Sequence, residues 1–115
     1  MIPKFKAYNP ANNKWYNSEE VFVCDGKIYL NDEDFEELTQ NNDVELMQST
    51  GLFDKNGKEI FEGDIVRMHS GELLPVKLHH GMFEPVCYYA SRAFGRVGNV
   101  FENPELLEHP DFREG

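Results

Sequence analysis

The sequence predicts a mainly β, α+β protein of antiparallel strands, with one short helix in the N-terminal half and a small barrel in the C-terminal half. Three observations lead to this fold class. Short runs in which apolar and polar residues alternate, the period of a half-buried strand, recur along the chain. Asp-Gly and Asn-Gly pairs, typical of two-residue hairpins, separate some of these runs. The segment after Asn31 has a capping residue and an acidic first turn, which favour a helix.

The chain of 115 residues has the usual length of a single domain. We expect one compact unit made of two lobes. Residues 1–50 are predicted to form an N-terminal α+β lobe, and residues 51–63 a hairpin-rich connector. Residues 64–115 are predicted to form the barrel, followed by a short helical tail.

The N-terminal lobe is predicted to be a small antiparallel meander. Residues 4–8 alternate in polarity, so Phe5 and Ala7 are expected to share one face of a strand. Asp25-Gly26 is expected to form the turn of a hairpin. A helix is predicted over residues 32–39, and the next strand over residues 44–48.

The connector is dense in turn-forming residues. Asn56-Gly57 predicts a type I′ hairpin turn, which needs positive φ at both central residues. Asp54 and Asp64 are interpreted as acceptors of local turn hydrogen bonds. The residues predicted to supply backbone freedom or core packing are Gly51, Gly57 and Gly63, and Leu52, Ile60 and Phe61.

Several short strands are predicted in the C-terminal half, which suggests a small barrel. Pro75 lacks an N–H group, so its strand is expected at a sheet edge or at a bulge. Gly98 predicts a bulge or a tight bend in the last strand. Asn103 and Pro104 predict one helical turn, with Asn103 as the cap.

Charge limits the partners that the protein can bind. The formal net charge is −10, so the overall field repels polyanions and anionic membrane surfaces. Residues 64–101 differ from the rest, because they carry four basic residues against three acidic ones. Cys24 and Cys87 form no Cys-x-x-Cys motif and are interpreted as reduced thiols. No apolar run has the length of a signal peptide or a membrane span, and we expect a cytoplasmic protein.

Three segments carry a resemblance to a known family. Residues 46–66 read LMQSTGLFDKNGKEIFEGDIV, residues 2–8 read IPKFKAY, and residues 97–107 read VGNVFENPELL. Together they resemble, in order, the YopX family of small proteins from phages and prophages of low-GC Gram-positive bacteria. The resemblance implies an N-terminal α+β lobe and a C-terminal SH3-like barrel. It implies no catalytic residues, and residues 68–96 match only in length and strand content.

The sequence contains no convincing catalytic or metal site. Asp54 opens a segment that partly resembles a calcium loop, but the positions that need an acceptor, a glycine and a glutamate hold Lys58, Glu59 and Ile65. His79 and His80 are expected on opposite faces of a strand, which disfavours joint binding of one ion. We therefore predict no catalytic residues, no cofactor and no metal, and no enzymatic activity.

Basic and aromatic residues are interleaved in the C-terminal half. Cations beside stacking aromatic rings are typical of single-strand binding, although such rings can equally fill a barrel core. The candidate contacts to a partner or a nucleic acid are Arg67, Lys77, Tyr88, Tyr89, Arg92 and Arg96.

The predicted function is that of a phage or prophage accessory protein that acts as a protein-interaction module. We expect a protein partner from host or phage, or a second copy of the chain, and no membrane association. The alternative is nucleic-acid binding through the basic and aromatic residues of the barrel.

Overall fold

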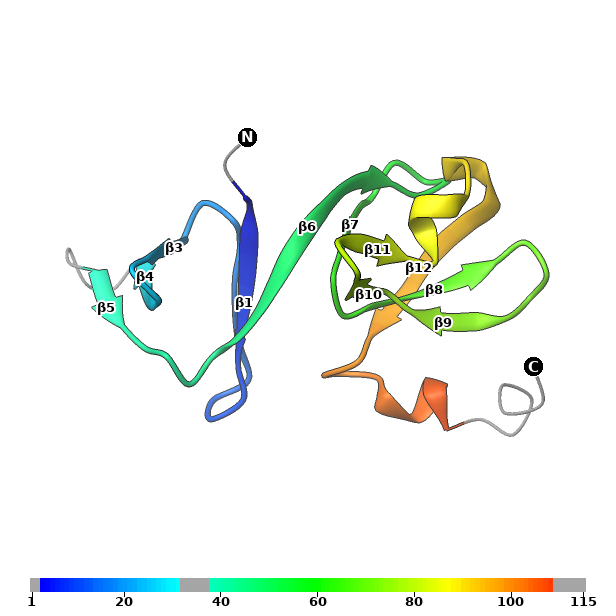
Figure 1. Cartoon of the computed structure of the whole chain (residues 1–115). Coiled ribbons are helices and arrows are strands. Elements are labelled where there is room, and N and C mark those ends of the chain that lie inside the picture. The colour runs from blue at the N-terminus through cyan, green and yellow to red at the C-terminus, as the bar shows by residue number, and fades with distance from the viewer. Residues whose placement is uncertain (1–2, 32–37, 109–115) are drawn as a thin grey trace. The chain divides into compact units, whose positions relative to one another are not determined.

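The computed structural model describes residues 3–31 and 38–108, which divide into two compact units, residues 1–48 and 49–115 (Figure 1). The chain is mainly β, and every strand pair among the described residues is antiparallel, as predicted. Strand β6 crosses the boundary between the units. The strands of the first unit are β1 (Phe5–Asn9), β2 (Lys14–Tyr16), β3 (Val21–Cys24), β4 (Lys27–Asn31), β5 (Leu38–Gln40) and the start of β6 (Glu45–Phe53).

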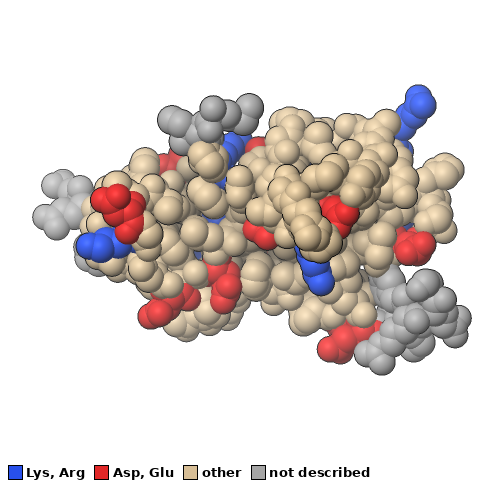
Figure 2. Space-filling view, in the orientation of Figure 1, with Lys and Arg blue, Asp and Glu red and all other residues tan. Residues whose placement is uncertain are grey.

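Acidic and basic side chains both lie at the surface, and the described residues include more acidic ones than basic ones. On the face shown in Figure 2, Asp and Glu recur across the surface, and Lys and Arg occur at fewer places. This distribution agrees with the net charge of −10.

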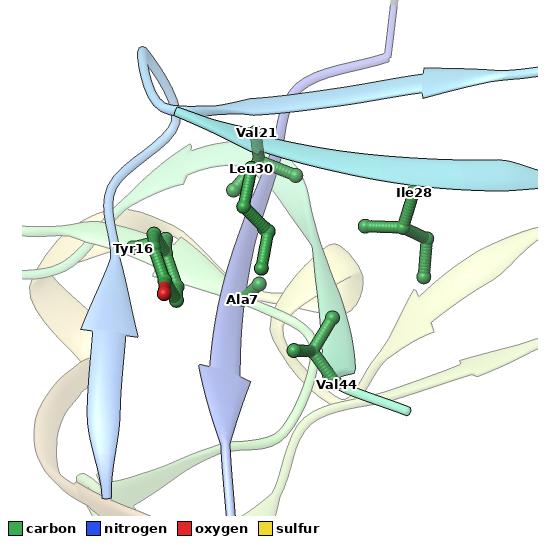
Figure 3. Close-up of a cluster of buried hydrophobic side chains, with 6 residues drawn as sticks. All are labelled: Ala7, Tyr16, Val21, Ile28, Leu30 and Val44. Carbon is green, nitrogen blue, oxygen red and sulfur yellow. The ribbon is translucent and has the colours of Figure 1, made fainter. Parts of the chain in front are cut away.

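The first unit packs a small core between two sets of strands. Strand β1 pairs with β2 and with residues 45–48 of β6, and β4 lies between β3 and β5. Ala7 of β1 lies in the core and Phe5 packs against it, which confirms the predicted face of this strand. The buried residues that meet there are Ala7, Tyr16, Val21, Ile28, Leu30 and Val44 (Figure 3).

The hairpin turn predicted at Asp25-Gly26 is confirmed. Both residues have positive φ, 51° and 75°, as a type I′ turn requires. Cys24 and Lys27 pair directly across the turn. The two residues therefore specify this turn locally.

The helix predicted over residues 32–39 is wrong at its C-terminal end. Leu38 and Thr39 belong to β5, where they pair with Asn31 and Leu30 of β4. In β5 the backbone groups form hydrogen bonds to β4 that they would otherwise have formed within a helix. This tertiary pairing overrides the local helix propensity. Residues 32–37 lie outside the described residues.

The described part of the second unit contains the remaining strands and three short 3₁₀ helices. Its core is formed by Ile60, Val66, Met68, Val76, Val86 and Phe94. Strand β8 lies between β12 and β9, and β10 pairs with β11. The elements are β7 (Glu59–Phe61), β8 (Asp64–Met68), β9 (Leu73–Pro75), β10 (Lys77–His79), β11 (Met82–Glu84), η1 (Val86–Tyr88), η2 (Ser91–Ala93), β12 (Phe94–Asn99) and η3 (Pro104–Leu107).

Predictions for individual positions in this unit largely hold. Pro75 lies on β9, at the edge of its sheet, and the β8–β12 register shifts between Arg96 and Gly98, as a bulge requires. Pro104 opens the predicted helical turn, which is a 3₁₀ turn. Asn103 does not cap it through its side chain, because its Oδ1 accepts a hydrogen bond from the N–H of Asn99 instead.

The stretch predicted as a connector is built into the second unit. Residues 51–63 include the end of β6 and all of β7, and within them Ile60 and Phe61 are buried. Gly51, Gly57 and Gly63 all have positive φ. The predicted type I′ turn at Asn56-Gly57 is wrong, because only Gly57 has positive φ.

Asp54 shapes the turn after β6. One carboxylate oxygen accepts hydrogen bonds from the N–H groups of Asn56 and Lys58, each at 2.9 Å. The other oxygen accepts the N–H of Arg96 on β12 at 2.8 Å. Burial alone would raise the pKa of Asp54, but these backbone hydrogen bonds outweigh it and hold the pKa below its ordinary value. The turn is therefore fixed by one carboxylate and attached by it to β12.

Asp64, on β8, is a second aspartate that bonds to β12. Its side chain is fully buried, and it accepts the N–H of Phe61 at 2.8 Å and the Nε–H of Arg96 at 3.0 Å. Arg96 is thus held through its backbone by Asp54 and through its guanidinium by Asp64. The predicted turn bonds of both aspartates are confirmed, and both residues also reach a distant strand.

Replacing Asp54 by Asn should destabilise the protein by about 2 kcal/mol at neutral pH, because an amide cannot accept all three N–H groups. The folded-state pKa of Asp54 is lowered, so its contribution is present above the ordinary value of 3.8 and is lost as pH falls through the folded-state pKa. The difference in free energy of unfolding between the wild type and Asp54→Asn should therefore become smaller at acidic pH. Urea unfolding followed by circular dichroism at several pH values measures it.

The matched control is Asp43→Asn, which changes an exposed aspartate. It should alter the free energy of unfolding by less than about 0.5 kcal/mol. Equal losses in the two variants would contradict the assigned role of Asp54.

Candidate functional site

The six predicted contact residues all lie in the second unit, but they do not form one patch. Arg67 and Arg92 line one pocket. Tyr89 lines a hollow that shares wall residues with that pocket. Lys77 lies at a separate groove beside β10 and β11.

The first feature, here called the cationic pocket, has a volume of about 180 Å³. Three basic residues line it, Lys55, Arg67 and Arg92, and His69 lines it as well. Among the described residues, none that lines the pocket is acidic, and the three cations have no ion-pair partner. The remaining wall residues are Met68, Gly71, Ala93 and Phe94.

The start of β12 brings these cations together. Arg67 on β8 pairs directly with Gly95, and directly opposed residues present their side chains on the same face of the sheet. A Cβ atom on Gly95 would lie 3.0 Å from Cε of Lys55, so the lysine side chain passes over the glycine. Because Gly95 has no side chain, the Lys55 side chain can lie on the same face of the sheet as Arg67.

Backbone hydrogen bonds attach the segments of Lys55 and His69 to the residues that precede Gly95. The N–H of Lys55 donates to the carbonyl of Phe94 at 3.0 Å, and the N–H of His69 donates to the carbonyl of Ala93 at 2.8 Å. Arg92 precedes Ala93 in η2 and is placed by the same contacts. Three chain segments distant in sequence thus converge on one pocket.

An apolar hollow of about 280 Å³ adjoins the cationic pocket. The two share Met68, His69 and Ala93, and the hollow adds Leu74 and Tyr89 together with the polar residues Ser70 and Glu72. Positive charge and apolar surface therefore lie side by side.

The second feature, here called the hairpin groove, has a volume of about 360 Å³. Its apolar walls are Leu74, Pro75, Leu78 and Pro85, and its polar lining is Lys77, His79 and Glu84. Leu78 and the nearby Met82 are each 43% exposed and Tyr88 is 60% exposed, values that are high for large apolar side chains. This segment therefore presents apolar surface to solvent.

Glu84 joins the two sides of the hairpin. Its Oε2 accepts the hydroxyl hydrogen of Tyr88 at 2.6 Å, and its Oε1 lies 3.0 Å from Nδ1 of His79. The Tyr88 hydrogen bond, followed by the nearby His79, lowers the pKa of Glu84. The same bond to the Glu84 carboxylate raises the pKa of Tyr88 to about 12.

Arg96 has a structural role in this arrangement. Its guanidinium bonds to buried Asp64, and its backbone bonds to Asp54. It lines neither the cationic pocket nor the hairpin groove.

The two adjacent histidines differ from their prediction. His80 lies in the β10–β11 turn with φ of 51°, so it is not a strand residue. Its ring centroid lies 4.0 Å from that of His79, and the expectation of opposite faces is wrong. No group of three or more His, Cys, Asp or Glu side chains that could hold a metal ion occurs in residues 3–31 and 38–108. Cys24 and Cys87 are both free.

Lys55 and His69 are site residues that sequence reasoning did not single out. Lys55 reads as part of a turn, and only the pairing of β8 with β12 brings it beside Arg67. The glycine at position 95 is the one local signal that a side chain crosses the strand there. The hairpin groove likewise depends on the break between β9 and β10 at Val76.

Within the described part of the chain, no helix is long and apolar enough to cross a membrane.

Fold and surface define a small, mainly β protein of two antiparallel units, with a cationic pocket and an apolar groove on the second. The family model "YopX protein" matches residues 4–108, and the chain belongs to the YopX family. The structure is similar to the crystal structure of protein EF1440 from Enterococcus faecalis, with a TM-score of 0.68 and 26% sequence identity over 93% of this chain and 99% of that one. No curated protein matches the sequence.

Tyr88 should ionise well above the ordinary tyrosine pKa of 10.0. Since its folded-state pKa is raised, the stabilisation by its hydrogen bond is complete below the ordinary value of 10.0 and is lost as pH rises through about 12. The near-ultraviolet absorbance of tyrosinate measures this in an alkaline titration. Tyr88→Phe should remove the step, and Glu84→Gln should move it toward 10.0. A titration of Glu84→Gln that matches the wild type would contradict the assigned bond.

Proposed function

We propose that this YopX family member is a phage or prophage accessory protein that acts in the host cytoplasm as a non-enzymatic protein-interaction module. The exposed apolar surface of the hairpin groove carries this proposal. The family resemblance implies an SH3-like barrel for the C-terminal half, an architecture that often serves as a recognition platform, although fold alone does not define a function.

The groove suits an extended segment of a partner protein. Leu74, Pro75, Leu78 and Pro85 offer apolar contact, and exposed apolar side chains gathered in one place commonly mark an interaction site. Strand β10 pairs only with β11 among the described residues, so its other edge is open to a further strand. A bound segment in extended conformation can thus combine edge pairing with side chains placed in the groove.

Charge indicates what surrounds the apolar part of that segment. The chain carries a net charge of −10, and Glu84 lies in the groove itself. A partner segment with basic residues beside its apolar side chains complements this field and is steered toward it. A second copy of this chain is a less suitable partner, because it carries the same negative charge.

Replacing Leu78 and Met82 by Ser should weaken partner binding at least tenfold, because the two side chains supply exposed apolar contact area beside the groove. The partner is identified by affinity capture, and its binding to purified protein is then measured by calorimetry. Light scattering of the free protein tests self-association in parallel.

The matched control is Val97→Ser, since Val97 on β12 is 41% exposed and lines neither feature of the second unit. Its affinity should equal that of the wild type. A partner that binds the Leu78 and Met82 variant as tightly as the wild type would sink the proposal.

Nucleic-acid binding is the second candidate function. One observation favours it: Arg67 and Arg92 line a pocket that adjoins the hollow of exposed Tyr89. The strong net negative charge disfavours it. Fluorescence anisotropy with single- and double-stranded oligonucleotides at low salt decides the matter. Saturable binding that Arg67→Gln and Arg92→Gln abolish would support this alternative, and none at micromolar protein would remove it.

A further inference from the structure

The geometry points to an anion-binding site in the cationic pocket, one that takes a single phosphate group. This inference does not rest on the hairpin groove. It concerns the cationic pocket, which shares no lining residue with the groove, and an adjoining hollow that shares only Leu74 with it.

The charge of the pocket is the first argument. The chain has 21 acidic residues and 11 basic ones, so a cation on its surface has many acidic residues available as partners. Lys55, Arg67 and Arg92 nevertheless line one pocket without an acidic wall residue in the described structure. Like charges held together repel each other, and a bound anion relieves that repulsion. The pocket is thus complementary to an anion that carries more than one negative charge.

The fold positions these cations individually. Lys55 is placed by its backbone bond to Phe94 and by the open space over Gly95. Arg67 is placed by its register opposite Gly95, and Arg92 by the η2 turn. Cations brought from three segments onto one pocket differ from a row of surface lysines, because the fold fixes the backbone positions from which they extend.

Size and chemistry narrow the ligand class. A pocket of about 180 Å³ has room for a phosphate group and is small for a stretch of nucleic-acid backbone. Arginine binds phosphate oxygens through paired N–H donors, and lysine adds a point charge. The field of the whole chain opposes a long polyanion but costs little for one dianionic group. A phosphate monoester fits these conditions best.

The adjoining hollow indicates what carries the phosphate. Leu74, Tyr89 and Ala93 supply its apolar lining, and Ser70 and Glu72 its polar lining. An organic group attached to the phosphate can lie there, with Tyr89 in position to stack on an aromatic ring. Both a phosphorylated side chain of a protein and a mononucleotide have this chemistry, and the experiment separates them.

The test is isothermal titration calorimetry of the full chain at constant low ionic strength, with chloride as the reference anion. The ligands are inorganic phosphate, a phosphotyrosine peptide with its unphosphorylated form, adenosine monophosphate and a single-stranded oligonucleotide. Phosphate should bind weakly and one monoester roughly tenfold more tightly, since it also fills the apolar hollow. The tighter monoester identifies the source of the phosphate group.

Three variants make the result specific. Arg67→Gln and Arg92→Gln should each weaken monoester binding roughly tenfold, the loss of one charge-assisted contact. Gly95→Ala keeps every charge but forces the Lys55 side chain aside, so it should also weaken binding, which mere attraction by net charge does not predict. Lys77→Gln is the control, because it removes an exposed cation of the same unit that lies outside the pocket.

Three outcomes would overturn the inference. In the first, phosphate and both monoesters release no more heat on binding than chloride does. In the second, Lys77→Gln and Arg67→Gln lose affinity equally, the behaviour of unspecific attraction. An oligonucleotide that binds more tightly than either monoester also rejects the single-phosphate site and favours nucleic-acid binding. None of these results bears on the hairpin groove, whose variants leave the cationic pocket unchanged.

Discussion

Two buried aspartates on either side of Arg96 are the constraint on which the second unit depends. Asp54 takes the backbone N–H of Arg96, and Asp64 takes its guanidinium. Asp54 also closes the turn after β6, so a single carboxylate couples that turn to β12. Lys55 follows Asp54 directly, and its position over Gly95 is a result of the same bonds. A structural ion pair and the cationic pocket thus share one origin.

Local chemistry decides which elements can be predicted from sequence. The Asp25-Gly26 turn could be predicted because the two residues themselves favour its backbone angles. The Asn56-Gly57 turn could not, because the Asp54 carboxylate imposes another geometry. Residues 38 and 39 have helical signals before them, but β4 offers a partner strand that no local pattern reveals.

The candidate site was predictable only in part for a similar reason. Arg67, Arg92 and Tyr89 stand out as basic and aromatic residues, and the structure places them on adjoining hollows. Lys55 joins them through strand register, and Arg96 is drawn away by an aspartate 32 residues earlier. Residue type can suggest a binding surface, but tertiary pairing selects which side chains remain available to a ligand.

Strand β6 has a practical consequence for studying the two halves separately. It pairs with β1 through residues 45–48 and with β7 through Ser49 and Phe53, so its two ladders meet at the unit boundary without overlapping. Among the residues that the structure describes, division of the polypeptide after Gln48 breaks no interstrand pair. Each fragment therefore keeps its own strand partners, and the two halves can be produced and studied one at a time.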